Sequence, residues 1–196
     1  MDINFWGFAY TTYFAAPYLR MTNGKIVVIA SSASWLNAPR LSFYNASKAA
    51  VVSFFETLRI EFAPDIGITI VTPGLIESEM TKGKFLNKKG KIVVDQDIRD
   101  VIMSIVPVEL VRKLAKAVVD GACRGDKYIT VPAWIRTTFF VKLLCPEVID
   151  WFNRWFCITE PRMPPTEAIS KKAIDLPGLK DIIWPDSIRC PKIKSN

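Results

Sequence analysis

Short apolar runs alternate along this chain with longer segments of helical periodicity. Residues 26–30 (IVVIA) and 67–74 (GITIVTPG) are mostly β-branched and apolar, which is typical of strands buried on both faces of a parallel sheet. Residues 126–132 (DKYITVP) predict a third short strand. Because helical segments separate these strands, the pattern predicts an α/β fold with a parallel sheet covered by helices on both faces.

Three segments predict helices around this sheet. Residues 3–19 are apolar on nearly every side, which predicts a buried helix that Pro17 ends or kinks. Ser42 is expected to cap the second helix, and residues 106–122 form a clearly amphipathic third one. The predicted core face of the second helix is Val51, Phe55, Leu58 and Phe62, and that of the third is Val111, Leu114, Ala115 and Val118.

Two further segments are harder to assign. Residues 77–107 are polar and poorly periodic, which predicts a long excursion containing a short helix. Residues 135–158 are aromatic and amphipathic. Within them, the aromatic stretch from Phe139 to Phe156 fits either a core or dimer face or a substrate-entry or membrane-surface patch. We therefore divide the chain into residues 1–135 and a helical extension with a tail, 136–196. A lysine cluster in the excursion indicates a solvated loop or, alternatively, an anion or headgroup contact: Lys82, Lys84, Lys88, Lys89 and Lys91.

The amino-acid composition limits the catalytic groups and metal sites that this chain can have. A chain of 196 residues without histidine has no histidine general base, no Ser/His/Asp or Cys/His triad and no histidine-ligated zinc site. Proton transfer must then use Tyr, Lys, Asp, Glu or Cys. The four cysteines are scattered, which indicates reduced thiols of an intracellular protein and neither a disulfide framework nor a metal site. The net charge of +7 is spread without a basic stripe, so we expect no nucleic-acid partner.

Targeting and membrane-spanning segments are not expected either. No apolar run reaches the roughly 18 to 20 residues that a transmembrane helix needs. The first residues also lack the basic segment and apolar core of a signal peptide.

Tyr44 and Lys48 are four positions apart at the start of the second predicted helix. Residues at this spacing lie on the same helix face, about 5 to 6 Å apart at their Cβ atoms. A nearby ammonium favours the ionised form of a phenol, so the pair fits a general acid/base. The spacing alone is also common by chance in helices.

Hydroxyl groups follow two of the predicted strands. Ser31 lies in the segment ASSAS after the first strand, and Ser78 lies in PGLIES after the second. Ligand sites of open α/β sheets lie at the carboxyl ends of the strands. These serines and Tyr44 are therefore expected at one edge of the sheet.

In these motifs the chain resembles the short-chain dehydrogenase/reductase family. The resemblance is carried by MDINFWG, GKIVVIASSAS, YNASK and VTPGLIESEM, in the family's order and spacing. Within the family the chain is most similar to the plant 11-beta/17-beta-hydroxysteroid dehydrogenase-like proteins, the steroleosins of oil bodies. The closer match rests on FWG, SFYNASKAA, FFETLRIE, ACRGDKYIT and CPEV, and the similarity reaches from residue 1 to about residue 188.

The resemblance implies a role for each matched residue. Asn4 would hold a water molecule in a proton relay, and Ser31 would bind the substrate oxygen, with Ser32 and Ser34 as alternatives for this role. Tyr44 would transfer the proton, and Lys48 would hold the nicotinamide ribose and tune the tyrosine. The residues expected to flank the nicotinamide are Pro73, Gly74, Ile76 and Ser78, where the family commonly has threonine in place of Ser78.

The family's glycine-rich phosphate-binding turn has no match in this chain. The resemblance therefore predicts the second half of a Rossmann-type doubly wound sheet in residues 1–135, with the N-terminal half missing. The strand at 26–30 would then have an uncovered edge, so we expect poor solubility or weak NADP(H) affinity from the chain expressed alone.

The resemblance also implies what this chain acts on and where. It implies an NADP(H)-dependent oxidoreductase, with NAD as the alternative cofactor, acting on a steroid or another hydrophobic alcohol or ketone. It further implies a lipid-droplet or endoplasmic-reticulum surface and a homodimer, although the relatives' N-terminal anchor has no match here and a cytoplasmic location is the alternative. The competing hypothesis is an inactive fragment that acts as a lipid-surface binding or interaction protein.

Overall fold

The computed structural model describes residues 1–86 and 90–189 and divides into two compact units. Unit 1 consists of Met1–Gly74 and Lys113–Lys142, and unit 2 consists of Leu75–Arg112 and Leu143–Asn196. Two lysines of the cluster discussed above, Lys88 and Lys89, lie outside the described residues, as does Cys190.

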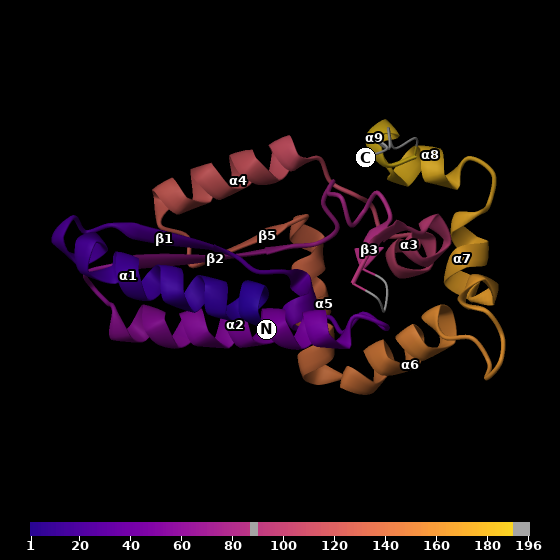
Figure 1. Ribbon diagram of the computed structural model, residues 1–196, viewed down its shortest axis with the longest axis horizontal. Coiled ribbons are helices and arrows are strands. Elements are labelled where there is room, and N and C mark those ends of the chain that lie inside the picture. Colours follow the sequence, from indigo (N-terminus) through magenta and orange to yellow (C-terminus); the bar gives the residue numbers. More distant parts are fainter. Residues whose placement is uncertain (87–89, 190–196) are drawn as a thin grey trace. The chain divides into compact units, whose positions relative to one another are not determined.

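Unit 1 is built on a three-stranded parallel sheet (Figure 1). Its strands are β1 (Lys25–Ile29), β2 (Gly67–Pro73) and β5 (Tyr128–Val131), in the spatial order β1-β2-β5. Both strand pairs are parallel, with Val28 of β1 opposite Ile70 of β2. The predicted α/β class with a parallel sheet is confirmed.

Helices lie on both faces of this sheet (Figure 1). On one face lie α1 (Gly7–Met21), which follows the π-helical turn η1 (Asp2–Trp6), and α2 (Ser42–Glu61). On the other face lies α4 (Val111–Arg124). The rest of unit 1 comprises the 3-10 turns η2 (Ser32–Ser34) and η3 (Ala133–Ile135) and helix α5 (Arg136–Leu144), whose last two residues belong to unit 2.

Successive residues of β2 face opposite helices, as the pleat of a strand requires. Ile68 and Ile70 join a core with the α1 and α2 side, whereas Val71 joins a core with α4. The predicted face of α2 is confirmed, because Val51 and Phe55 are buried and Leu58 and Phe62 pack beside them. The predicted face of α4 was partly wrong, since Leu114, Ala117 and Val118 make the contact while Val111 and Ala115 are exposed.

The first strand is not buried on both faces, contrary to the prediction for residues 26–30. Val28 packs under α2, but Val27 is 39% exposed and Ile29 is 42% exposed. The alternation of side chains along β1 puts these two residues on the α4 side of the sheet, where the buried contacts of α4 are with β2 and β5. Within the described residues β1 pairs only with β2, so its other edge is uncovered.

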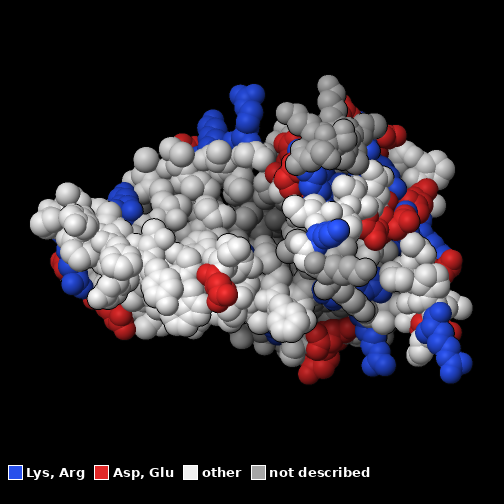
Figure 2. Space-filling view, viewed as in Figure 1, with Lys and Arg blue, Asp and Glu red and all other residues white. Residues whose placement is uncertain are grey.

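The first helix also differs from the prediction. It is not buried all round, and Pro17 does not end it, because α1 continues to Met21. Phe8 packs into the core, but Tyr10, Tyr13 and Phe14 are among its exposed side chains. Figure 2 shows few charged side chains on the face of unit 1 that α1 and α2 form. An apolar sequence therefore gave a helix with a large uncharged outer face.

Unit 2 contains a hairpin and several helices. The prediction of one short helix within residues 77–107 holds for α3 (Gln96–Met103), but the antiparallel pair β3 (Lys84–Leu86) and β4 (Ile92–Val94) was not predicted. The apolar core of unit 2 consists of Met103, Val108, Ile174, Trp184 and Ile188. The remaining elements are α6 (Pro146–Cys157), η4 (Pro165–Glu167), α7 (Ile169–Ile174), α8 (Leu179–Ile183) and α9 (Asp186–Arg189).

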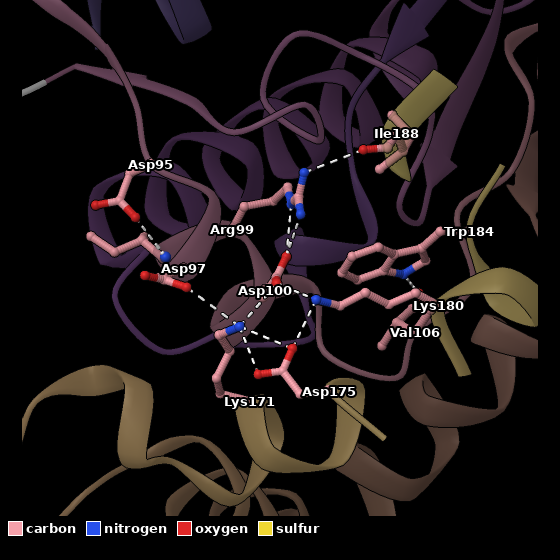
Figure 3. A network of polar contacts seen from close by, with 11 residues as sticks. Asp95, Asp97, Arg99, Asp100, Val106, Lys171, Asp175, Lys180, Trp184 and Ile188 are labelled. Carbon is pink, nitrogen blue, oxygen red and sulfur yellow. Dashed lines mark hydrogen bonds and ion pairs between the residues drawn. The ribbon is translucent and has the colours of Figure 1, made fainter. Parts of the chain in front are cut away.

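A buried ion network joins three helices of unit 2 (Figure 3). The Asp100 side chain of α3 is 3% exposed and accepts hydrogen bonds from Arg99 at 2.6 Å, from Lys180 at 2.7 Å and from Lys171 at 3.2 Å. Asp175 binds both lysines, at 2.8 Å in each case. Burial alone would raise the pKa of Asp175, but the hydrogen bonds from Lys171 and Lys180 outweigh it and hold this pKa below its ordinary value.

We expect Asp100→Asn to destabilise the chain by roughly 3–5 kcal/mol, because it leaves the buried Arg99 guanidinium without its counter-charge and removes one of the two carboxylates that Lys171 and Lys180 share. Asp97→Asn is the matched control, since the Asp97 side chain is 66% exposed and lies 3.4 Å from Lys171. Its loss should cost less than about 1 kcal/mol. Urea unfolding followed by circular dichroism measures both. Equal losses in the two variants would contradict a central role for Asp100.

Candidate functional site

Tyr44 and Lys48 extend the buried face of α2 toward the N-terminus of the helix. Together with Val51, Phe55 and Leu58 they recur at spacings of four, three, four and three, so all five lie on one stripe of the helix. Val51 and Phe55 pack against the strands of unit 1. The two polar residues therefore continue a core face at the point where the sheet ends.

Lys48 is buried at the carboxyl end of β1. Its Nζ donates a hydrogen bond to the carbonyl oxygen of Ile29 at 3.2 Å. The same nitrogen lies 5.8 Å from the ring centroid of Tyr44 and 5.3 Å from that of Phe8. Burial lowers the pKa of Lys48 below its ordinary value. An ammonium with one polar contact among the described residues and two aromatic neighbours is positioned to bind a further acceptor.

Ser31 stands directly after the end of β1. It caps the turn η2, where its Oγ accepts a hydrogen bond from the backbone N–H of Ala33 at 3.1 Å. The alternatives are also close to this turn: Ser32 is buried within it, and the Ser34 hydroxyl donates to the Ser31 carbonyl oxygen at 2.7 Å. The turn contacts α2, so the Ser31 loop and the helix of Tyr44 are neighbours.

Asn4 reaches the same helix through a residue that the sequence analysis missed. Its Nδ2 donates to the Oγ of Ser47 at 3.2 Å, and the Ser47 hydroxyl donates to the Tyr44 carbonyl oxygen at 2.7 Å. These bonds tie η1 to the first turns of α2. The signal available in the sequence was the position of Ser47, one residue before Lys48 and three after Tyr44.

Pro73 and Gly74 lie at the end of β2. The Gly74 N–H donates to the Val131 carbonyl oxygen at 2.8 Å. A Cβ atom at this glycine would overlap the terminal methyl group of Ile135, so any larger residue here requires the Ile135 side chain to move.

Unit 1 therefore contains Asn4, Ser31, Tyr44, Lys48 and the pair Pro73–Gly74. Ile76 and Ser78 belong to unit 2, where Ile76 bridges to Glu109 and the backbone N–H of Ser78 donates to the Thr81 Oγ1 at 2.7 Å. The catalytic and cofactor roles of all these residues stay predictions.

Comparison with known proteins finds a matching family and similar plant proteins. Residues 1–89 match the short chain dehydrogenase family. The whole chain is 53% identical to 11-beta-hydroxysteroid dehydrogenase A of Sesamum indicum and 52% identical to 11-beta-hydroxysteroid dehydrogenase 1A of Arabidopsis thaliana. Each alignment covers 100% of this chain and 56% of the relative. The chain thus spans about half the length of the curated relatives it matches.

Solved structures show the same fold. A short chain dehydrogenase from Burkholderia cenocepacia, in complex with NADP, superposes with a TM-score of 0.60 at 20% identity, over 76% of this chain and 55% of that one. The Rossmann-type architecture expected from the sequence is confirmed. Across the described part of the chain, no helix has the length and apolar character needed to traverse a bilayer.

The low pKa of Lys48 gives a test of the site's geometry. A titration of the labelled Lys48 amine by nuclear magnetic resonance should give a value below its ordinary 10.5, because burial penalises the ammonium. Tyr44→Phe should leave this titration nearly unchanged, since burial and not the phenol is the cause. A Lys48 amine that titrates at or above its ordinary value would show that water reaches it freely.

Proposed function

The chain belongs to the short chain dehydrogenase family, and from this premise we propose that it is an NADP(H)-dependent oxidoreductase of the hydroxysteroid dehydrogenase type. The proposed reaction interconverts an alcohol and a ketone on a steroid or another hydrophobic substrate. One observation carries the proposal: Tyr44 and Lys48 continue the core stripe of α2 to the carboxyl end of a parallel sheet.

The names of the relatives support the substrate class and the cofactor. The two plant relatives are 11-beta-hydroxysteroid dehydrogenases, and the Burkholderia structure was solved with NADP. NAD is the alternative cofactor. The chain spans about half the length of those relatives. The proposal therefore covers only the steps that the residues of this half would carry out.

The residues of unit 1 fit such a cofactor. Lys48 offers a buried ammonium beside the phenol, and Gly74 offers backbone without a side chain at the end of β2. Lys48 would hold the ribose, and Pro73 and Gly74 would flank the nicotinamide. When bound, the cofactor exchanges a hydride with the substrate carbon.

The side chains of the chain itself would manage the proton and the substrate oxygen. The Ser31 hydroxyl would donate a hydrogen bond to the carbonyl oxygen of the ketone. The Tyr44 hydroxyl would give its proton to that oxygen during reduction and take it back during oxidation. Asn4 would support proton return through a water molecule. The hydrogen bond from Asn4 to Ser47 keeps the turn η1 beside the first turns of α2, which carry Tyr44.

Replacing the phenol tests this assignment. Tyr44→Phe should lower the rate of NADPH oxidation with a hydrophobic ketone by roughly 10²–10⁴-fold, the usual contribution of a positioned acid/base. Tyr18→Phe on α1 is the matched control, because Tyr18 is exposed and should leave the rate unchanged. Absorbance of NADPH measures the rate. Equal rates in the Tyr44 variant and the unmodified chain would remove Tyr44 from the chemistry.

A second candidate function is binding to a lipid surface without turnover, and a specific feature of unit 2 favours it. Helix α6 exposes Val148, Trp151, Phe152 and Trp155 on one face, while Phe156 is buried. The rings of Trp151 and Trp155 are stacked at 5.8 Å. Among the described residues neither indole N–H has a hydrogen-bond partner. Such a face fits the interfacial layer of a membrane or lipid droplet, the location we propose.

The double variant Trp151→Gln and Trp155→Gln tests the lipid contact. Its binding to phosphatidylcholine vesicles should fall at least tenfold, because burial of each large apolar side chain contributes about 1.5–3 kcal/mol. Trp134→Gln is the control, since Trp134 is exposed on η3 outside α6. Co-sedimentation with vesicles measures binding. Unchanged binding of the double variant would rule out α6 as a lipid contact, and the proposed enzymatic activity is independent of this result.

A further inference from the structure

A cavity of about 450 Å³ opens beside the first turns of α2. Its wall comes from two parts of unit 1, the segment between η2 and α2 and the start of α2 itself. Arg40 is the one charged residue among the described residues of this wall, and Ser34, Ser42 and Asn45 are among its polar residues. Ala38 and Ala46 add apolar surface. The cavity is thus small, and its wall combines apolar surface with several polar groups and one positive charge.

The N-terminus of α2 meets this cavity without a cap. The sequence predicts Ser42 as the capping residue, but this was wrong: the cap position is Leu41, whose side chain has no acceptor. Within the described residues, the backbone N–H groups of Ser42, Phe43 and Tyr44 have no protein acceptor. Three free N–H groups and the positive end of a helix of 20 residues favour an anion there.

Arg40 adds a full positive charge beside the same N-terminus. Its guanidinium forms no ion pair and no hydrogen bond with any described residue. Planar guanidinium groups bind oxyanions through two parallel hydrogen bonds. Arg40 therefore has its whole donor set available for a ligand in the cavity.

Asn45 supplies an independent observation that points to a ligand. It lines the cavity, is only 8% exposed, and its Nδ2 donates to the Ala38 carbonyl oxygen at 3.0 Å. That bond fixes the orientation of the amide and leaves Oδ1 as a buried acceptor with no donor. Buried acceptors without a partner are rare and costly, so this oxygen calls for a donor from outside the chain.

From these groups we propose that the cavity is a binding site for a phosphate that keeps one O–H, either inorganic phosphate or a phosphomonoester. The charged oxygens of the phosphate receive hydrogen bonds from Arg40 and from the free N–H groups of α2. The O–H of the phosphate donates to Oδ1 of Asn45. A fully ionised oxyanion such as sulfate satisfies Arg40 and the helix but leaves Asn45 without its donor.

The comparison of phosphate with sulfate tests the site on the unmodified chain. At about pH 5 most of a phosphomonoester still carries a proton, because its second pKa is near 6. Titration with inorganic phosphate, with glycerol 3-phosphate and with sulfate should shift the amide resonances of Ser42, Phe43 and Tyr44. We expect both phosphates to bind at least tenfold more tightly than sulfate. If inorganic phosphate binds more tightly than glycerol 3-phosphate, the free ion is the preferred ligand. The reverse order identifies the phosphomonoester.

Two variants separate the contribution of Arg40 to anion binding from that of Asn45. Arg40→Gln should weaken both kinds of anion at least tenfold, whereas Arg112→Gln, which removes an exposed charge outside the cavity, should change neither. Asn45→Ala should abolish the preference for phosphate while sulfate still binds. If Asn45→Ala does not fold, the phosphate-to-sulfate ratio of the unmodified chain still decides. Equal affinity for the two anions, or shifts that persist in Arg40→Gln, would overturn the proposal.

Discussion

Val51 and Phe55 of α2 pack against Val28, Ile68 and Ile70 of the sheet, and this contact sets the rotation of the helix about its axis. A helix that buries one stripe has no freedom to choose where the rest of that stripe points. Lys48 and Tyr44 lie one and two turns toward the N-terminus on the same line. They are therefore carried to the carboxyl end of the strands, where Lys48 meets the Ile29 carbonyl oxygen.

Polar residues on a core face are costly unless they have partners, which is why this end of the stripe is informative. Burial lowers the pKa of Lys48, and among the described residues its one hydrogen bond is to a backbone oxygen. The adjoining loop and turn add a buried hydroxyl, Ser31, and the link from Asn4 to Ser47. A buried amine with a lowered pKa at the carboxyl end of a parallel sheet is typical of a functional site.

The segment between β1 and α2 contributes residues to both proposed sites. Its first residues place Ser31 at the sheet edge, and its last residues place Arg40 beside the uncapped start of α2. Unit 2 is held in a different way, because the Asp100 carboxylate joins α3 to α7 and α8 through buried charges (Figure 3). The two units thus rely on different interactions, apolar packing in the first and an ion network beside a smaller apolar core in the second.

The sequence by itself determined the relations within each element. The strand runs, the stripe of α2 and the spacing of Tyr44 and Lys48 all follow from local periodicity, and the motifs around them identified the family. Burial depends on which other elements lie opposite, so only the tertiary structure decided that Val27 and Ile29 are exposed, together with all aromatic residues of α1 except Phe8. The cap of α2, the bond from Asn4 to Ser47 and the partners of Asp100 were decided in the same way. Each depends on where a backbone or side chain from another segment comes to rest, which no periodic pattern in one segment encodes.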